Sequence, residues 1–230
     1  MAMMTMKLKM SNILSMLVAL KRRLFDGKKN PFLMLNHPFE TVDDIKQKRN
    51  GSRFYATLLL IAFTVSAIIS DVGTSFMYST LRIKDFNILI TLATSGLMVL
   101  LFVVGNWAIS TLFSAEGRMS DVYIMICYNL TPLIGYNLIY SFLSHFLLPD
   151  EFVFVEILGT VSWIWFIALM FIGVMTIHNY SFKGTLINLL MSVVAMAVIF
   201  FLIFLFVVLM QQLYVFILTI YTECRMRWLS

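Results

Sequence analysis

The chain is poor in the residues that most often build catalytic and metal sites. Among 230 residues there are two cysteines and three histidines, and charged residues make up only 13%. Cys127 lies inside a long apolar run and Cys224 lies near the C-terminal end, so we predict no disulfide between them. The histidines are scattered, without the spacing of metal ligands. We therefore expect no cofactor and no metal.

Sequence motifs of the common enzyme classes are also missing. The chain contains no HExxH, no GxSxG and no GxxxxGK[ST] segment. Ionisable side chains in the long apolar runs lie toward the ends of those runs, which disfavours a proton-coupled transporter. No pair of short, interrupted apolar segments marks a transport site. We expect a protein that is not an enzyme.

Apolar residues are abundant, at 60% of the chain, and the mean hydropathy is +0.90. Crossing the hydrocarbon core of a bilayer takes about 20 apolar residues in a helix. Five runs meet this length, at about 54–77, 86–113, 122–148, 152–177 and 185–210. The sequence therefore predicts an all-α integral membrane protein with a five-helix membrane domain over 54–210.

The segment before the first run, 1–53, is predicted to be cytoplasmic or interfacial. Eleven of the 17 basic residues lie in it. An apolar face between Met10 and Leu24 favours a helix on an anionic membrane surface or against a partner, although a helix without any partner remains an alternative. A second helix is predicted within 36–52, with Thr41 and Asp44 as a capping box and Gly51 at its end. This helix either sets the angle of the first span or docks a cytoplasmic partner.

Polar residues within the spans are predicted to hold helices together. Ala62, Ser66, Ser70 and Thr74 give the first span a face of small side chains that another helix can approach. Asp71 lies near the far end of that span, where we expect it to be hydrated or hydrogen-bonded.

The third span is the most polar, with Asn129, Pro132 and Asn137 inside it. Pro132 predicts a kink, and the carbonyl that it frees needs a hydrogen-bond donor, which an Asn or Tyr side chain of a neighbouring helix could supply. These residues either pack the helices or line a path for a small solute or lipid, a path that would also include Tyr136 and Trp163.

The fifth apolar stretch, from Thr185 to Tyr221, is about 55 Å long as a helix, almost twice the hydrocarbon thickness. We expect the span to end near Met210, at Gln211 and Gln212. Residues 211–230 would then form an extracytoplasmic extension that lies along the far surface or projects from it. The distribution of basic residues places the N-terminus in the cytoplasm.

Several motifs along the chain resemble the Ypt-interacting protein (Yip) family, and more closely its bacterial branch found beside carbohydrate ABC importers. The matching residues are Pro38-Phe39, Asp44-Ile45-Lys46, Gly51-Ser52, Asn106-Trp107, Thr111-Leu112, Glu116-Gly117, Tyr128 with Pro132, His178 with Tyr180-Ser181 and Lys183, Gln211-Gln212, and Tyr221 with Glu223. They cover residues 36 to 223 in order. Lys48, Asn50 and the turn Ser-Ala-Glu-Gly depart from the family pattern in charge.

The resemblance implies a multi-pass protein of the cell membrane that acts as an accessory subunit. Its partners would be membrane lipids and other integral membrane subunits, foremost the permease of a sugar ABC importer, and no nucleic acid. A passive solute or lipid pathway and a free-standing membrane organiser are the alternatives. The candidate partner contacts are Asp43, Asp44, Lys46, Arg49, Gly51, Glu116, Gly117, His178 and Lys183. The candidate polar packing residues within the membrane are Asp71, Asn106, Asn129, Pro132 and Asn137.

Overall fold

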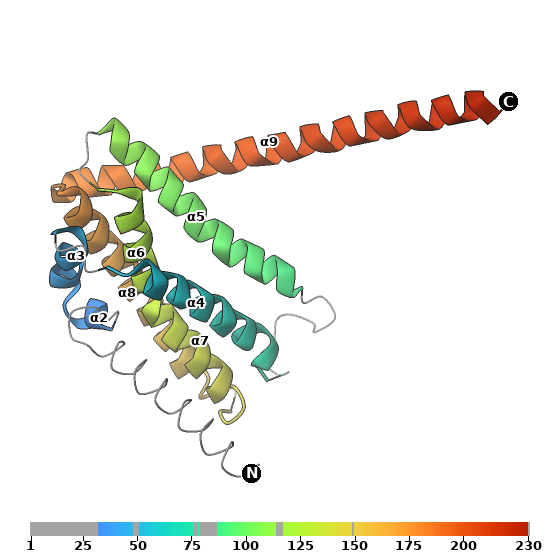
Figure 1. Cartoon of the computed structure of the whole chain (residues 1–230). Coiled ribbons are helices and arrows are strands. Elements are labelled where there is room, and N and C mark those ends of the chain that lie inside the picture. Colours follow the sequence, from blue (N-terminus) through green and yellow to red (C-terminus); the bar gives the residue numbers. More distant parts are fainter. Residues whose placement is uncertain are drawn as a thin grey trace, which may run out of the picture.

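The computed structural model describes residues 32–47, 51–75, 78, 87–113, 117–148 and 150–229. Every element in these residues is a helix (Figure 1). Five helical segments are long and apolar enough to cross a membrane: Arg53–Gly73, Ile88–Leu112, Met119–Leu143, Val153–His178 and Phe182–Met226. The predicted class, an all-α protein with five membrane-spanning helices, is confirmed.

The centre of the bundle is the short helix α6 (Met119–Asn129). Its side chains Val122, Met125 and Cys127 are fully buried. The helices α4 (Arg53–Gly73), α5 (Ile88–Leu112) and α8 (Val153–His178) all pack against it. Helix α7 (Thr131–Leu143) continues the direction of the third span and packs against α4 and α8.

Two short helices, α2 (Leu33–Asn36) and α3 (Pro38–Gln47), lie at one end of the bundle (Figure 1). Val42 and Ile45 of α3 are buried, and α3 packs against α6 and α8. The predicted capping box does not form, because the helix already begins at Pro38, where a missing N–H costs nothing. Thr41 lies inside the helix and donates its hydroxyl to the His37 carbonyl at 2.8 Å. The helix predicted near the N-terminus lies outside the described residues.

The third span divides into α6 and α7 at Leu130, as Pro132 predicts. Proline removes the N–H that would bond to the carbonyl four residues earlier, which is that of Tyr128. The hydroxyl of Thr131 donates to this carbonyl at 2.6 Å. The predicted donor, a side chain on a neighbouring helix, was therefore wrong. The side chain of Thr131, in the same span, is the donor instead.

The small face predicted for the first span contacts α7. Ser66 is buried, and its hydroxyl accepts a hydrogen bond from the Asn137 amide at 3.2 Å. Farther along, the Ser141 hydroxyl donates to the Ile69 carbonyl at 3.3 Å. Asp71 is half-buried, two residues before α4 ends. Small side chains thus let the two helices approach closely enough for direct hydrogen bonds.

The longest helix, α9 (Phe182–Leu229), has 48 residues and a length of about 72 Å. It crosses α5 at Gly105, where an added Cβ would lie 3.2 Å from Met196 Cγ and 3.3 Å from the Ser192 carbonyl oxygen. Beyond this crossing α9 leaves the bundle and projects far from it (Figure 1). The helix runs through Gln211 and Gln212 without a break.

Candidate functional site

Five polar side chains from three helices meet where α5, α8 and α9 converge, and we call this cluster the polar junction. Its members are Asn106 and Ser110 of α5, His178 at the end of α8, and Asn188 and Ser192 of α9. Each of the five is 2% exposed or less. Buried polar groups are costly unless they are hydrogen-bonded, so the partners of each group decide what the cluster does.

Asn106 is the hub of the polar junction. Its amide nitrogen donates to Asn188 Oδ1 at 2.8 Å and to Ser192 Oγ at 3.0 Å. Asn188 in turn donates to Ser110 Oγ at 3.3 Å, and Ser192 donates to the Asn188 carbonyl at 2.7 Å. These bonds fasten α5 to α9 just beside their close crossing at Gly105.

The same network assigns the tautomer of His178. Because both amide hydrogens of Asn106 are used, Asn106 Oδ1 is an acceptor, and it lies 3.0 Å from His178 Nε2. Nε2 therefore carries the hydrogen, which it also directs toward Ser110 Oγ at 3.1 Å. Nδ1 is then an unprotonated acceptor. It is buried and has no hydrogen-bond partner among the described residues.

Gly117, two residues before α6, lies against the histidine ring. A Cβ added at Gly117 would lie 2.5 Å from His178 Cε1 and 2.6 Å from Nδ1, so only glycine allows the backbone this close. From the other direction, Lys46 of α3 is near enough to interact electrostatically with the ring.

The turn between α8 and α9 runs from His178, the last residue of α8, to Ser181, the residue before α9. His178 enters the polar junction, and Asn179 takes the left-handed conformation (φ 57°, ψ 38°) that commonly ends a helix. Tyr180 stacks on the His178 ring with centroids 5.4 Å apart. The hydroxyl of Ser181 accepts from the Gly184 N–H at 3.3 Å, which caps the start of α9.

The Tyr180 hydroxyl lies beside the polar junction and, like His178 Nδ1, is a buried polar group without a hydrogen-bond partner among the described residues. It lies close to Ser110 but does not reach hydrogen-bonding geometry. Burial raises the pKa of this hydroxyl, and the nearby Ser110 lowers it by a smaller amount. The group is therefore a neutral phenol at physiological pH.

A serine next to a histidine invites comparison with hydrolases, in which the imidazole takes a proton from the serine. Here His178 Nε2 already carries a hydrogen directed at Asn106, so it cannot serve as a base for Ser110. Both side chains are also closed off from solvent. The geometry is that of a structural joint between three helices.

The structure places the predicted partner contacts on α3, at two closely packed glycines, at the start of α9 and in the polar junction. Asp43 lies on α3 and accepts a hydrogen bond from Gln47 at 2.6 Å, while Asp44 and Lys46 are half-buried. Gly51 packs against Ile45 and Ile124, and Gly117 against His178. Lys183 is exposed in the first turn of α9.

His178 is buried rather than exposed, so a partner cannot touch its ring in this conformation. Arg49 and Glu116 lie outside the described residues.

The polar residues predicted inside the third span are engaged in packing. Asn129 is fully buried and donates to the sulfur atoms of Met125 at 3.0 Å and Met170 at 3.4 Å. Asn137 bonds to Ser66, and Trp163 faces outward with 55% of its surface exposed. In the described part of the chain, no three His, Cys, Asp or Glu side chains are close enough to hold a metal ion.

Sequence reasoning singled out Asn106 and His178 but missed Ser110, Asn188 and Ser192. It treated the fifth apolar stretch as uninterrupted before Gln211. The available signal was spacing, because Asn188 and Ser192 lie four residues apart, as do Asn106 and Ser110. Residues four apart share one face of a helix, so each pair marks a polar face in an apolar span.

Comparison with known proteins gives one positive result. The Yip1 domain model matches residues 32–206, which include every member of the polar junction and end within α9. Searches of curated proteins and of solved structures found no match. Because the matched segment covers most of the 230 residues, the chain belongs to the Yip1 domain family.

Proposed function

We propose that this multi-pass membrane protein is a non-enzymatic accessory subunit that binds or stabilises a partner membrane complex. The observation that supports this most is the outward face of α3. Val42 and Ile45 fix the helix against the bundle, while Phe39, Glu40 and Gln47 are exposed on its other side. An aromatic side chain among polar groups on a firmly held helix is typical of a protein contact surface.

The ends of the helices support the same proposal. The polar junction, the His178–Ser181 connection and α3 gather at one end of the bundle, where they stiffen the framework that carries α3 (Figure 1). Eleven of the 17 basic residues lie within 1–53, up to the first residue of the first span, which favours a cytoplasmic location for this end. A partner would then meet a preformed cytoplasmic face.

The partner that we propose is the permease of a carbohydrate ABC importer in the plasma membrane. This identity rests on the resemblance to the bacterial branch of the family. The solute or lipid pathway is less well supported, because Asn129 and Asn137 are occupied by contacts within the bundle.

The test is purification of the tagged full-length protein from its native membrane in mild detergent, followed by identification of what accompanies it. We expect permease subunits in stoichiometric yield. The double variant Glu40→Lys and Asp43→Lys reverses charge on the exposed face of α3 and should remove the partner. Glu223→Lys, which changes charge on α9 far from α3, is the matched control and should retain it.

A protein that purifies without other membrane subunits contradicts the proposal and favours a free-standing membrane organiser. Permease subunits that remain bound to the α3 variant contradict the assigned surface. A flux assay in liposomes that gives solute transport by the purified protein alone, lost in Asn129→Leu with Asn137→Leu, would support the pathway instead.

A further inference from the structure

At the end of the bundle opposite α3, three polar side chains converge where α7 packs against α8. Tyr136 and Tyr140 lie on α7, one turn apart, and Glu156 lies in the first turn of α8. Glu156 is near enough to both phenols to interact with them electrostatically. None of the three side chains makes a hydrogen bond or an ion pair to any described residue. Convergent polar groups that remain unpaired are available to fix a ligand.

The packing of the two tyrosines fixes the positions of their hydroxyls. Tyr136 lies against the backbone of α8, because a Cβ added at Gly159 would be 2.6 Å from its Cζ and 2.6 Å from its hydroxyl oxygen. The Tyr140 ring meets the buried Phe152 ring edge to face, with centroids 5.3 Å apart. Gly159 and Phe152 lie three residues after and four residues before Glu156, so both are its neighbours on the surface of α8. The three polar groups are therefore held in place before a ligand arrives.

The site lies at the depth of the lipid headgroups and is open toward lipid. Helix α8 has 26 residues and a length of about 39 Å, so it extends beyond a hydrocarbon core of about 30 Å. Glu156, three residues from the start of α8, then lies near the boundary between headgroups and hydrocarbon. Its side chain is exposed, and so are the apolar side chains of Val153 and Ile157 beside it and of Ile139 on α7. A ligand that fits these surroundings has a polar head and an apolar tail.

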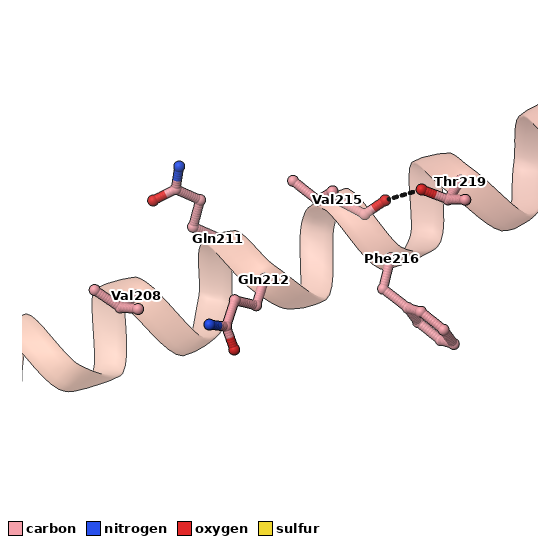
Figure 2. Close-up of a pocket in the computed structure, with 6 residues that line it drawn as sticks. All are labelled: Val208, Gln211, Gln212, Val215, Phe216 and Thr219. Atoms are coloured by element: carbon pink, nitrogen blue, oxygen red, sulfur yellow. Dashed lines mark hydrogen bonds between the residues drawn. The ribbon is translucent and has the colours of Figure 1, made fainter.

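The glutamines of α9 show by contrast an arrangement that does not make such a site. Gln211 and Gln212 line a shallow groove on the surface of that single helix (Figure 2). Figure 2 shows their side chains extending on opposite sides of the ribbon, so they cannot hold one small head between them. Where α7 meets α8, two helices bring the polar groups together instead.

We propose that Glu156, Tyr136 and Tyr140 bind the primary ammonium of an ethanolamine phospholipid. This headgroup carries one positive charge and three N–H donors, and the site offers one carboxylate and two phenol oxygens as acceptors. A choline headgroup has the same charge but no N–H, so it cannot donate to the phenols. A headgroup with only negative charge is repelled by Glu156. The site thus distinguishes lipids by their hydrogen-bond donors as well as by their charge.

Quenching of Trp163 fluorescence by lipids with brominated tails tests the proposal on the full-length protein in vesicles. Trp163 is seven residues after Glu156, on the same side of α8 and about 10 Å deeper, and 55% of its surface is exposed. Its indole therefore lies beside the tails of a lipid whose head is bound at the site. Replacing Trp107, Trp165 and Trp228 by Phe leaves Trp163 as the single reporter.

Ethanolamine and choline phospholipids with identical tails are mixed in equal amounts, and one of the two is brominated at a time. We expect the ethanolamine lipid to be favoured beside Trp163 by about fivefold, the upper range of what an exposed charge pair contributes. Equal quenching by the two lipids would overturn the proposal.

Variants of the single-tryptophan protein assign the preference to the three groups. Glu156→Gln keeps the shape of the side chain and should bring the preference close to one. Tyr136→Phe with Tyr140→Phe keeps the rings, removes both hydroxyls and should lower the preference about twofold. Glu223→Gln removes a negative charge on α9, away from the site, and is the matched control that should retain the full preference. A preference that Glu156→Gln leaves unchanged would overturn the assigned site.

Two other sources of an ammonium group give different results. If soluble ethanolamine at low concentration removes the preference, the site takes a free amine and the lipid assignment is wrong. If neither lipid is favoured, and Glu156→Gln releases a protein that otherwise accompanies the chain from its native membrane, the site receives a basic side chain of that protein. The quenching experiment uses the purified chain without an importer, so its result is independent of the proposed function.

Discussion

Gly117 lies against the ring of His178, in contact with the one imidazole nitrogen that has no hydrogen-bond partner. Its φ is not positive, so the need for glycine comes from the neighbouring ring and not from the backbone conformation. Ile177 Cγ2 also lies 2.6 Å from the position of an added Cβ. The contact leaves no space for a methyl group.

Gly117→Ala should therefore lower the free energy of unfolding by about 1–3 kcal/mol, the range expected for overpacking a tight site. Gly96→Ala is the matched control, because an added Cβ there meets nothing within 4 Å. In the interior of α5 it should be neutral or stabilise by up to about 1 kcal/mol. In a Cys224→Ala background, the buried Cys127 thiol reports unfolding through reaction with a maleimide dye. Equal melting temperatures for both variants would contradict the close contact.

At the scale of single residues, the sequence identified the positions of structural importance but not the surroundings of their side chains. Glu116-Gly117 and His178 were recognised as family-like positions and predicted to contact a partner, which requires accessible side chains. Burial of His178 depends on α5, α8 and α9 meeting at one point, and no local pattern encodes that meeting. A lone histidine at the end of an apolar run looks the same whether it faces water or another helix.

The junction between α6 and α7 shows how a proline can be accommodated inside a span. Pro132 leaves the Tyr128 carbonyl without its usual donor, and Thr131 supplies one from its side chain. The kink was predictable, because the missing N–H is a property of proline alone. The donor was not, because it depends on the rotamer that Thr131 adopts in the folded bundle.

This pairing of residues predicts that two substitutions are coupled. Thr131→Val removes the hydroxyl donor and leaves the Tyr128 carbonyl only its contact with the Leu130 N–H, so it should destabilise the protein by about 1 kcal/mol. In a Pro132→Ala background the restored N–H can reach the same carbonyl, so Thr131→Val should cost clearly less. A double-mutant cycle on thermal unfolding measures the difference. If the two costs are the same, Thr131 does not compensate for the proline.

For the molecule as a whole, the five spans were predictable because length and hydropathy are local properties of the chain. The polar junction could not be assembled in the same way, since its residues lie up to 86 positions apart. The sequence likewise did not determine the direction in which α9 leaves the bundle. Only the tertiary crossing at Gly105 decides where the second half of that helix goes.

The distribution of basic residues predicts that the two ends of the chain lie on opposite sides of the membrane. Cys224 is exposed near the end of α9 and should react with an impermeant maleimide on intact cells. A thiol introduced by Glu40→Cys in a Cys224→Ala background should react only after permeabilisation. The reverse pattern would place the N-terminus outside.

The connection between α8 and α9 has a consequence for how the gene can vary in length. A single residue inserted into His178–Ser181 would turn α9 by about 100° about its own axis and carry Asn188 and Ser192 out of reach of Asn106. An insertion after Phe206 would leave that contact in phase and rotate only the free part of the helix. The length of the short connection therefore fixes the rotation of α9 relative to α5, while the far half of α9 can lengthen or shorten without changing the contacts in the bundle.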